Sequence, residues 1–173
     1  MQLDQRIGKK AYLKPGLGIS GGNVERDIYS VQRLLKKSQQ PLSIIRAFQR
    51  NSIYMKSWVY RTLKKEKIFH KKKKLNIGIL GLAYKENTNS IKNSPTLHLL
   101  KKLKNIRIRI YDPKAKLEKK IKNCDQVKNI NYLIKNSDLI IIMTPWSEFY
   151  KIDKILKTQR NRKIILIDPY RVI

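Results

Sequence analysis

The sequence is poor in cysteine and histidine and has no long apolar run, and each shortage excludes a class of protein. One cysteine, Cys124, rules out an internal disulfide, and two distant histidines, His70 and His98, do not make a zinc site. No apolar run is long enough to span a membrane, and the first ten residues lack the apolar core of a signal peptide. We therefore expect a cytoplasmic protein with no membrane contact.

Acidic residues are also scarce, at 12 against 40 Lys and Arg, which gives a net charge of +28. Such a charge attracts anions, including nucleotides, nucleic acid and acidic lipid, without selecting among them. Lysine runs such as residues 71–74 equally suit a solvated surface encoded by an AT-rich gene, and we favour that interpretation. Nucleic acid is therefore not the expected partner.

The 173 residues are enough for one full domain and a smaller piece. Residues 24–65 have the pattern of helix with a break at Pro41. The second piece carries an apolar stripe at helical spacing: Ile45, Phe48, Met55, Val59 and Leu63. We expect a glycine-rich loop and helices over residues 1–65, a basic linker over 66–74, and a second domain over 75–173.

In that second domain, short β-branched runs alternate with helix-like segments. The predicted strands are 75–80, 106–111, 138–144 and 163–168, and the predicted helices lie near 95–104, 128–136 and 147–158. The pattern predicts an α/β fold with a parallel sheet covered by helices on both faces. The run DLIIIMT is typical of a strand buried on both faces, whereas IRIRIY alternates and suits a strand nearer an edge.

The stretch KPGLGISGGNVERD contains a literal G-x-G-x-x-G at Gly16, Gly18 and Gly21. A dinucleotide fingerprint follows a strand and is followed about 20 residues later by an acidic residue. Here Pro15 precedes the glycines, and no acidic residue follows Asp27 until Glu66. The loop leads into a helix whose first N–H groups suit an anion or a polar sugar, so we interpret it as a substrate loop. A glycine-rich connection without a ligand is the alternative.

Five motifs in order resemble the UDP-glucose/GDP-mannose dehydrogenase family. They are RIGKKAYLKPGLGISGGNVERD, GLAYKENTNSIKNSP, the YDP at 111–113, SDLIIIMTPWSEF and IDPYRVI. They cover essentially the whole chain but match only the carboxyl-terminal half of such an enzyme. The resemblance implies a Rossmann-like domain preceded by a long helical segment that forms the dimer interface in the family. The NAD-binding domain, with the family's upstream lysine and asparagine, has no counterpart among these motifs. The apolar stripe near Phe48 fits either that dimer interface or an ordinary face packed on a core.

The resemblance also implies a chemistry, the oxidation of a sugar C6 alcohol to a carboxylate by two hydride transfers to NAD through a cysteine thioester. Asn23 stands at the position of that cysteine, and an amide cannot replace a thiolate. Ser20 has no base beside it, and Cys124 belongs to the other domain. Asp27 matches the aspartate that assists water, and its alternative role is to complement the helix dipole. We therefore expect the chain alone to be inactive.

The remaining site residues are also implied by the resemblance. Expected contacts to the nucleotide sugar come from Tyr12, Leu13, Gly16, Gly18, Gly21, Tyr84, Lys85 and Arg171. Lys92 stands where the family has an arginine that reaches the phosphates of the cofactor. Three further interpretations come from position in the chain and not from the resemblance. Asp112, at the end of a predicted strand, could accept from a ribose hydroxyl; Ser94, before Pro95, could cap a helix or touch the ligand; and Trp146, at a strand end, suits packing.

The expected function is therefore the nucleotide-sugar-binding part of an NAD-dependent, UDP-glucose-type 6-dehydrogenase. Its implied partners are a UDP-sugar and either a second copy of the chain or a separate NAD-domain chain. A UDP-sugar-binding module without catalysis is the alternative, and a basic nucleic-acid-binding protein is motivated by charge alone.

Overall fold

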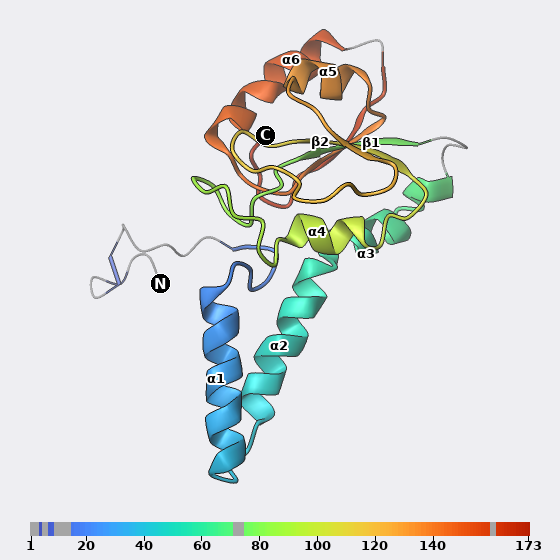
Figure 1. Ribbon diagram of the computed structural model, residues 1–173. Helices are drawn as coiled ribbons and strands as arrows, with labels where there is room; N and C mark the ends of the chain where they lie inside the picture. The colour runs from blue at the N-terminus through green and yellow to red at the C-terminus, as the bar shows by residue number, and fades with distance from the viewer. Residues whose placement is uncertain (1–3, 5–6, 9–14, 71–74, 160–161) are drawn as a thin grey trace.

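The computed structural model describes residues 4, 7–8, 15–70, 75–159 and 162–173, and Figure 1 shows a sheet domain from which a pair of helices projects. The sheet has five parallel strands in the order β3-β2-β1-β4-β5. Their bounds are β1 Asn76–Leu80, β2 Arg107–Tyr111, β3 Cys124–Gln126, β4 Leu139–Ile142 and β5 Ile165–Ile167. The predicted α/β fold with a parallel sheet is confirmed.

Helices cover both faces of this sheet. Helices α3 (Trp58–Lys65) and α4 (Pro95–Leu100) lie on one face, and α5 (Ile130–Lys135) and α6 (Ile152–Thr158) lie on the other (Figure 1). A 3₁₀ helix, η2 (Ser147–Lys151), leads into α6. Among the helices that the structure describes, none combines the length and apolar character needed to cross a membrane.

The core is centred on β1 and β4. All four residues of β4 have 0% exposure, as do Ile77, Ile79 and Leu80 of β1. An apolar strand of this kind is expected where helices cover both faces of a parallel sheet. The prediction for the run DLIIIMT is therefore confirmed.

The edge of the sheet differs from the prediction. β2 is an inner strand, because β3 pairs with it on the outside. The alternation of polar and apolar residues in IRIRIY was misleading, because Arg109 is only 6% exposed. Its guanidinium donates to the Asn136 carbonyl at 2.8 Å and lies over the Tyr132 ring. β3 itself was not predicted, because three residues of the polar sequence CDQ carry no apolar periodicity.

The amino-terminal helices also break once more than predicted. The break at Pro41 is confirmed, between α1 (Asn23–Lys37) and α2 (Ser43–Lys56). A second break at Ser57 separates α2 from α3, where the Ser57 hydroxyl donates back to the Tyr54 carbonyl at 2.8 Å, a contact that bends helices. After α3 a short 3₁₀ helix, η1 (Ile68–His70), follows, and residues 71–74 lie outside the described residues.

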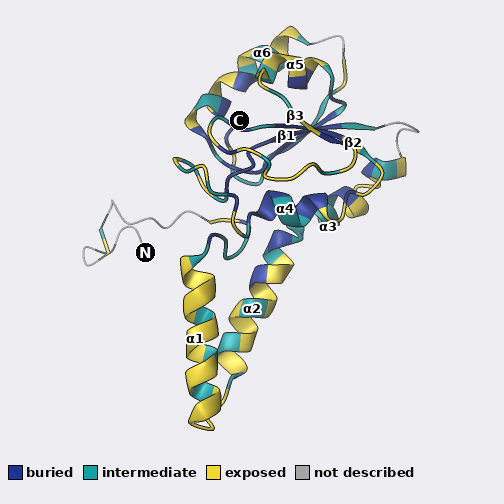
Figure 2. Ribbon diagram, viewed as in Figure 1, coloured by how far each residue is buried: buried dark blue, intermediate teal, exposed yellow. Residues whose placement is uncertain are grey.

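The predicted apolar stripe is divided by this second break. Val59 and Leu63 of α3 are fully buried in the core of the sheet domain, whereas Phe48 of α2 is 54% exposed. α1, described along its whole length, buries none of its residues. Figure 2 shows that the helical hairpin, α1 and α2, is exposed over most of its surface. Its exposed large apolar residues are Val24, Tyr29, Val31, Leu34, Ile44, Phe48, Ile53 and Tyr54.

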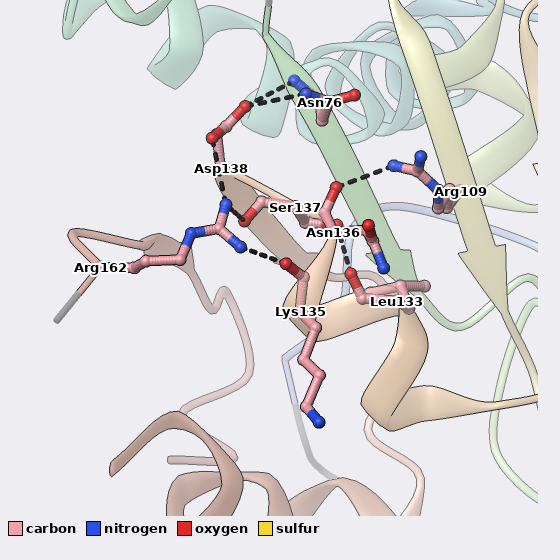
Figure 3. Close-up of polar contacts among 8 residues, drawn as sticks. All are labelled: Asn76, Arg109, Leu133, Lys135, Asn136, Ser137, Asp138 and Arg162. Carbon is pink, nitrogen blue, oxygen red and sulfur yellow. Dashed lines mark hydrogen bonds and ion pairs between the residues drawn. The ribbon is translucent and has the colours of Figure 1, made fainter. Parts of the chain in front are cut away.

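A polar network at the turn from α5 to β4 fixes the amino ends of β1 and β4 (Figure 3). Asp138 accepts from the backbone and side-chain nitrogens of Asn76 at 3.0 and 3.1 Å. Arg162 donates to the carbonyls of Lys135 and Ser137 and forms an ion pair with Asp138 at 3.4 Å. The network therefore joins the turn to the start of β1 and to the segment before β5.

We predict that Gly78→Ala destabilises the sheet domain. A Cβ at Gly78 would lie 2.4 Å from the Leu133 side chain and 2.6 Å from the Ser137 hydroxyl, because α5 packs directly on β1. Overpacking of this kind costs about 1–3 kcal/mol of unfolding free energy, which urea titration measures. Gly16→Ala is the matched control, since nothing lies within 4 Å of its Cβ position. Equal stability of the two variants would contradict the prediction.

Candidate nucleotide-sugar site

A cavity of about 950 Å³ lies at the carboxyl ends of the strands. The loops that follow β1, β4 and β5 form its walls, and the glycine-rich segment before α1 closes it. It is lined by Pro15, Gly16, Leu17, Gly18, Ser20, Tyr84, Lys85, Pro95, Pro145, Tyr150, Pro169, Tyr170 and Arg171. β1 and β4 are neighbours whose connections lead to opposite sides of the sheet, and parallel α/β sheets bind ligands at such a point.

The glycine loop, residues 16–22, packs tightly against two other segments. At Gly18 a Cβ would lie 2.6 Å from the Ser52 carbonyl oxygen of α2, and at Gly21 it would lie 2.8 Å from the Tyr84 ring. Both glycines have positive φ, +87° and +77°, which side chains rarely adopt. These two glycines are therefore required where the loop meets α2 and the segment after β1.

The buried carboxylate of Asp112, at the end of β2, organises the carboxyl ends of the strands. It is 8% exposed and accepts five hydrogen bonds. The donors are the backbone nitrogens of Leu82, Ala83, Lys114 and Ala115 at 2.7, 2.9, 2.9 and 2.7 Å, and the Trp146 indole at 3.2 Å. The interpretation of Asp112 as a ribose acceptor is therefore wrong, because the donors that hold the loops occupy both oxygens. Trp146, 4% exposed, packs as expected.

The β1–α4 loop, residues 81–94, is tied to the fold at both ends. The Ser94 hydroxyl accepts from the Thr96 nitrogen at 3.1 Å and donates to the Leu82 carbonyl at 2.7 Å. Of the two roles left open for Ser94, the structure shows the helix cap. Thr144, after β4, donates to the Ala83 carbonyl at 2.7 Å and so joins two walls of the cavity.

Two cations and three tyrosines line the cavity, from the segments that follow β1, β4 and β5. Tyr84 and Lys85 follow β1, with the Lys85 ammonium 5.7 Å from the centre of the Tyr84 ring. Arg171 follows β5 in a left-handed conformation, φ +54°. Asp168 positions that segment by accepting from the nitrogens of Tyr170, Val172 and Ile173 at 3.0, 2.5 and 2.9 Å. Tyr84, Lys85 and Arg171 are thus brought to one cavity with Gly16 and Gly18.

The residues expected to serve catalysis and the cofactor are not among those that line this cavity. Asn23 is the first residue of α1 and is exposed, and Asp27 follows one turn later, paired with Arg26 at 3.5 Å. Lys92 is exposed, and its ammonium would lie 2.9 Å from a Cβ at Gly22. Neither Asp27 nor Lys92 lines the cavity. Tyr12 and Leu13 lie outside the described residues.

Outside the glycine loop, sequence reasoning missed five lining residues, namely Pro95, Pro145, Tyr150, Pro169 and Tyr170. A signal was present, because Pro145 and Pro169 come directly after predicted strands, and such positions form the ligand edge of a parallel sheet. Tyr150 lies in η2, and its position depends on how that helix folds back over the end of β4.

Cys124 does not line the cavity. It lies in β3, at the edge of the sheet, and burial together with the nearby Asp125 raises its pKa to about 11. A thiol of this kind is protonated and poorly reactive at neutral pH. Within the described residues, no group of His, Cys, Asp and Glu side chains could hold a metal ion.

The arrangement is that of a nucleotide-binding α/β domain. Its cavity lies at the topological switch point and combines cationic side chains with tyrosine rings that can pack against a base or sugar.

The comparisons with known proteins identify the class. Residues 78–173 match the model of the UDP-glucose/GDP-mannose dehydrogenase family, UDP binding domain, and the chain belongs to this family. It is 28% identical over 170 residues to the UDP-glucose 6-dehydrogenase TuaD of Bacillus subtilis, covering 95% of this chain and 36% of that protein. It is 35% identical over 162 residues to the UDP-glucose 6-dehydrogenase of Rickettsia bellii, covering 87% and 36%.

A solved structure has the same fold. The UDP-glucose dehydrogenase of Pyrobaculum islandicum superposes with a TM-score of 0.79 at 24% identity, over 99% of this chain and 38% of that one. The chain therefore spans about a third of the length of the relatives that it matches, in their carboxyl-terminal, UDP-binding part.

We predict that Cys124 resists alkylation in the folded protein. At about pH 8 a thiol with this pKa is ionised to on the order of one part in a thousand, and burial further limits access. Iodoacetamide labelling followed by mass spectrometry should be complete only after denaturation. Rapid labelling of the native chain would contradict the prediction and would show that Cys124 is a reactive thiol.

Proposed function

We propose that this chain binds a UDP-sugar in the cavity at the carboxyl ends of β1, β4 and β5. The observation that supports this proposal best is the convergence of Lys85, Arg171 and the glycine loop on one cavity at the switch point of the sheet. Two cations suit a diphosphate, and the tyrosines suit a base or a sugar ring. Glucose is the sugar that the names of the relatives favour.

We further propose that the bound sugar is not oxidised by these residues alone. Oxidation in the manner of the family needs a thiolate at position 23 and an NAD site, and the described residues form one sheet whose cavity we assign to the sugar nucleotide. In a well-studied hydrolase, removal of a covalent nucleophile costs a factor on the order of 10⁶ in rate. We therefore propose that NAD takes part only when a separate cofactor domain binds it.

The helical hairpin is the proposed contact with a second copy of the chain or with a separate NAD-domain chain. Its apolar side chains are exposed along both helices, and a surface of this kind is usually covered by a partner. The cytoplasm is the proposed location, in keeping with the single buried thiol of Cys124.

Calorimetric titration with UDP, UDP-glucose and pyrophosphate tests the binding proposal. We expect UDP to bind at least about tenfold more tightly than pyrophosphate, because the cavity contacts base and sugar as well as phosphate. A random RNA is titrated in parallel, and its binding should fall steeply with added salt. Equal affinity for UDP and pyrophosphate would overturn the proposed site.

Lys85→Ala should weaken UDP binding about tenfold by removing a charge-assisted hydrogen bond. Lys104→Ala is the control of equal charge, since Lys104 is exposed at the opposite, amino-terminal edge of the sheet. Equal losses for the two variants would mean that general charge, and not the cavity, attracts the nucleotide.

We predict that Asn23→Cys creates a reactive thiol. Position 23 is exposed at the start of α1, whose amino end has no side-chain cap, so the helix dipole lowers the pKa of a cysteine there. In a Cys124→Ala background, iodoacetamide should label the new thiol at least about tenfold faster than it labels native Cys124. Labelling as slow as that of Cys124 would show that position 23 is not open to a substrate.

A further inference from the structure

Lys56 is a buried cation in the last turn of α2. Its side chain is only 7% exposed, and lysine is seldom buried unless its ammonium has a partner. That partner is Asn93 of the β1–α4 loop, whose Oδ1 accepts from the Lys56 Nζ at 2.5 Å. Burial lowers the pKa of Lys56, and the charge of Glu25 partly opposes this shift. The Lys56 ammonium is thus removed from water and donates to the side-chain amide of Asn93.

Asn93 transmits this contact to the glycine loop. Its Nδ2 donates to the Ile19 carbonyl at 3.3 Å, and its backbone adopts a left-handed conformation, φ +52°. An ammonium can only donate and a carbonyl can only accept, so Lys56 and Ile19 together fix which way the amide faces. With the donor of Lys56 removed, only the Ile19 carbonyl would still orient the amide, through one hydrogen bond of 3.3 Å.

The second polar group of Ile19 is held from the same helix. The Ile19 N–H donates to the Ser52 Oγ at 2.9 Å, and Ser52 lies one helical turn before Lys56. Gly18 lies against that turn, where a Cβ would meet the Ser52 carbonyl oxygen at 2.6 Å. Ser52, Lys56 and Asn93 form a clamp that holds both backbone polar groups of Ile19.

Ile19 lies between Gly18 and Ser20, which both line the cavity. The position of its backbone therefore sets the wall that the glycine loop contributes. We propose that Lys56 is a positioning residue for the nucleotide-sugar site, holding the glycine loop in place through Asn93 without touching the ligand. The identity of the ligand in this inference rests on the proposed function. The geometry of the clamp is independent of that proposal.

Lys56→Met removes the ammonium and keeps the length of the side chain. We expect hydrogen exchange of the Ile19 amide, followed by NMR, to become about tenfold faster, because the loop loses one side of its clamp. We expect the dissociation constant for UDP to rise by about the same factor. Lys104→Met, which removes an exposed lysine, should leave both values unchanged.

The variant Asn93→Asp distinguishes two roles of the Asn93 contact. One is to position Ile19, and the other is only to give the buried ammonium of Lys56 a partner. The carboxylate still accepts from Lys56 and adds an ion pair, but it has no N–H to offer the Ile19 carbonyl. We expect fast Ile19 exchange and weaker UDP binding in a protein that melts no lower than the native chain. A purely structural role for Lys56 would instead leave Ile19 exchange and UDP affinity at native values in this variant.

The outcomes distinguish the two proposals. If the native chain does not bind UDP, the proposed function fails, and Ile19 exchange alone decides the clamp. If Lys56→Met and Asn93→Asp both retain native Ile19 exchange, the clamp is overturned whatever the UDP affinity. If Lys56→Met does not fold, Asn93→Asp decides the clamp alone, because it removes the N–H that reaches the Ile19 carbonyl.

Discussion

The carboxylate of Asp112 is the contact on which the site depends. Loops leave β1, β2 and β4 at one edge of the sheet, and Asp112 accepts hydrogen bonds from residues of all three. An unpaired carboxylate in so buried a position would cost several kcal/mol, and its five donors compensate for that burial. Because these donors are mostly backbone N–H groups, the carboxylate fixes the course of the loops themselves, and the cavity walls are built on loops that are already held.

Close packing adds a second constraint, and it explains the glycines better than cofactor binding does. The literal G-x-G-x-x-G places Gly18 on α2 and Gly21 on the Tyr84 ring, at distances that leave no room for a side chain. The loop therefore joins the helical hairpin to the sheet domain at the edge of the cavity. A substitution at either glycine would move this wall of the cavity even if the new side chain touched no ligand. The G-x-G-x-x-G motif here serves packing, whereas after a strand it serves dinucleotide binding.

Features carried by apolar periodicity or by proline could be predicted from the sequence. The run DLIIIMT forms the inner strand β4, and Pro41 separates two helices, because burial on both faces and a missing N–H act locally. The break at Ser57 and strand β3 could not be found in this way, since a hydroxyl that bonds back to the helix and a short polar strand leave no periodic signal. The roles of Asp112 and Lys56 depend on partners far away in the chain. The sequence therefore suggested a ligand for Asp112 and gave no indication of a role for Lys56.

Charge becomes informative only when the positions of the few carboxylates are known. Lys85 and Arg171 line a cavity to which, among the described residues, no Asp or Glu contributes. Asp112 and Asp168, at the ends of β2 and β5, direct their oxygens to backbone N–H groups. The cavity cations therefore face no competing carboxylate, and a ligand with two negative charges is the species that would neutralise them. The net charge of +28 does not identify a ligand, whereas this local separation of cations from carboxylates favours a diphosphate at one edge of the sheet.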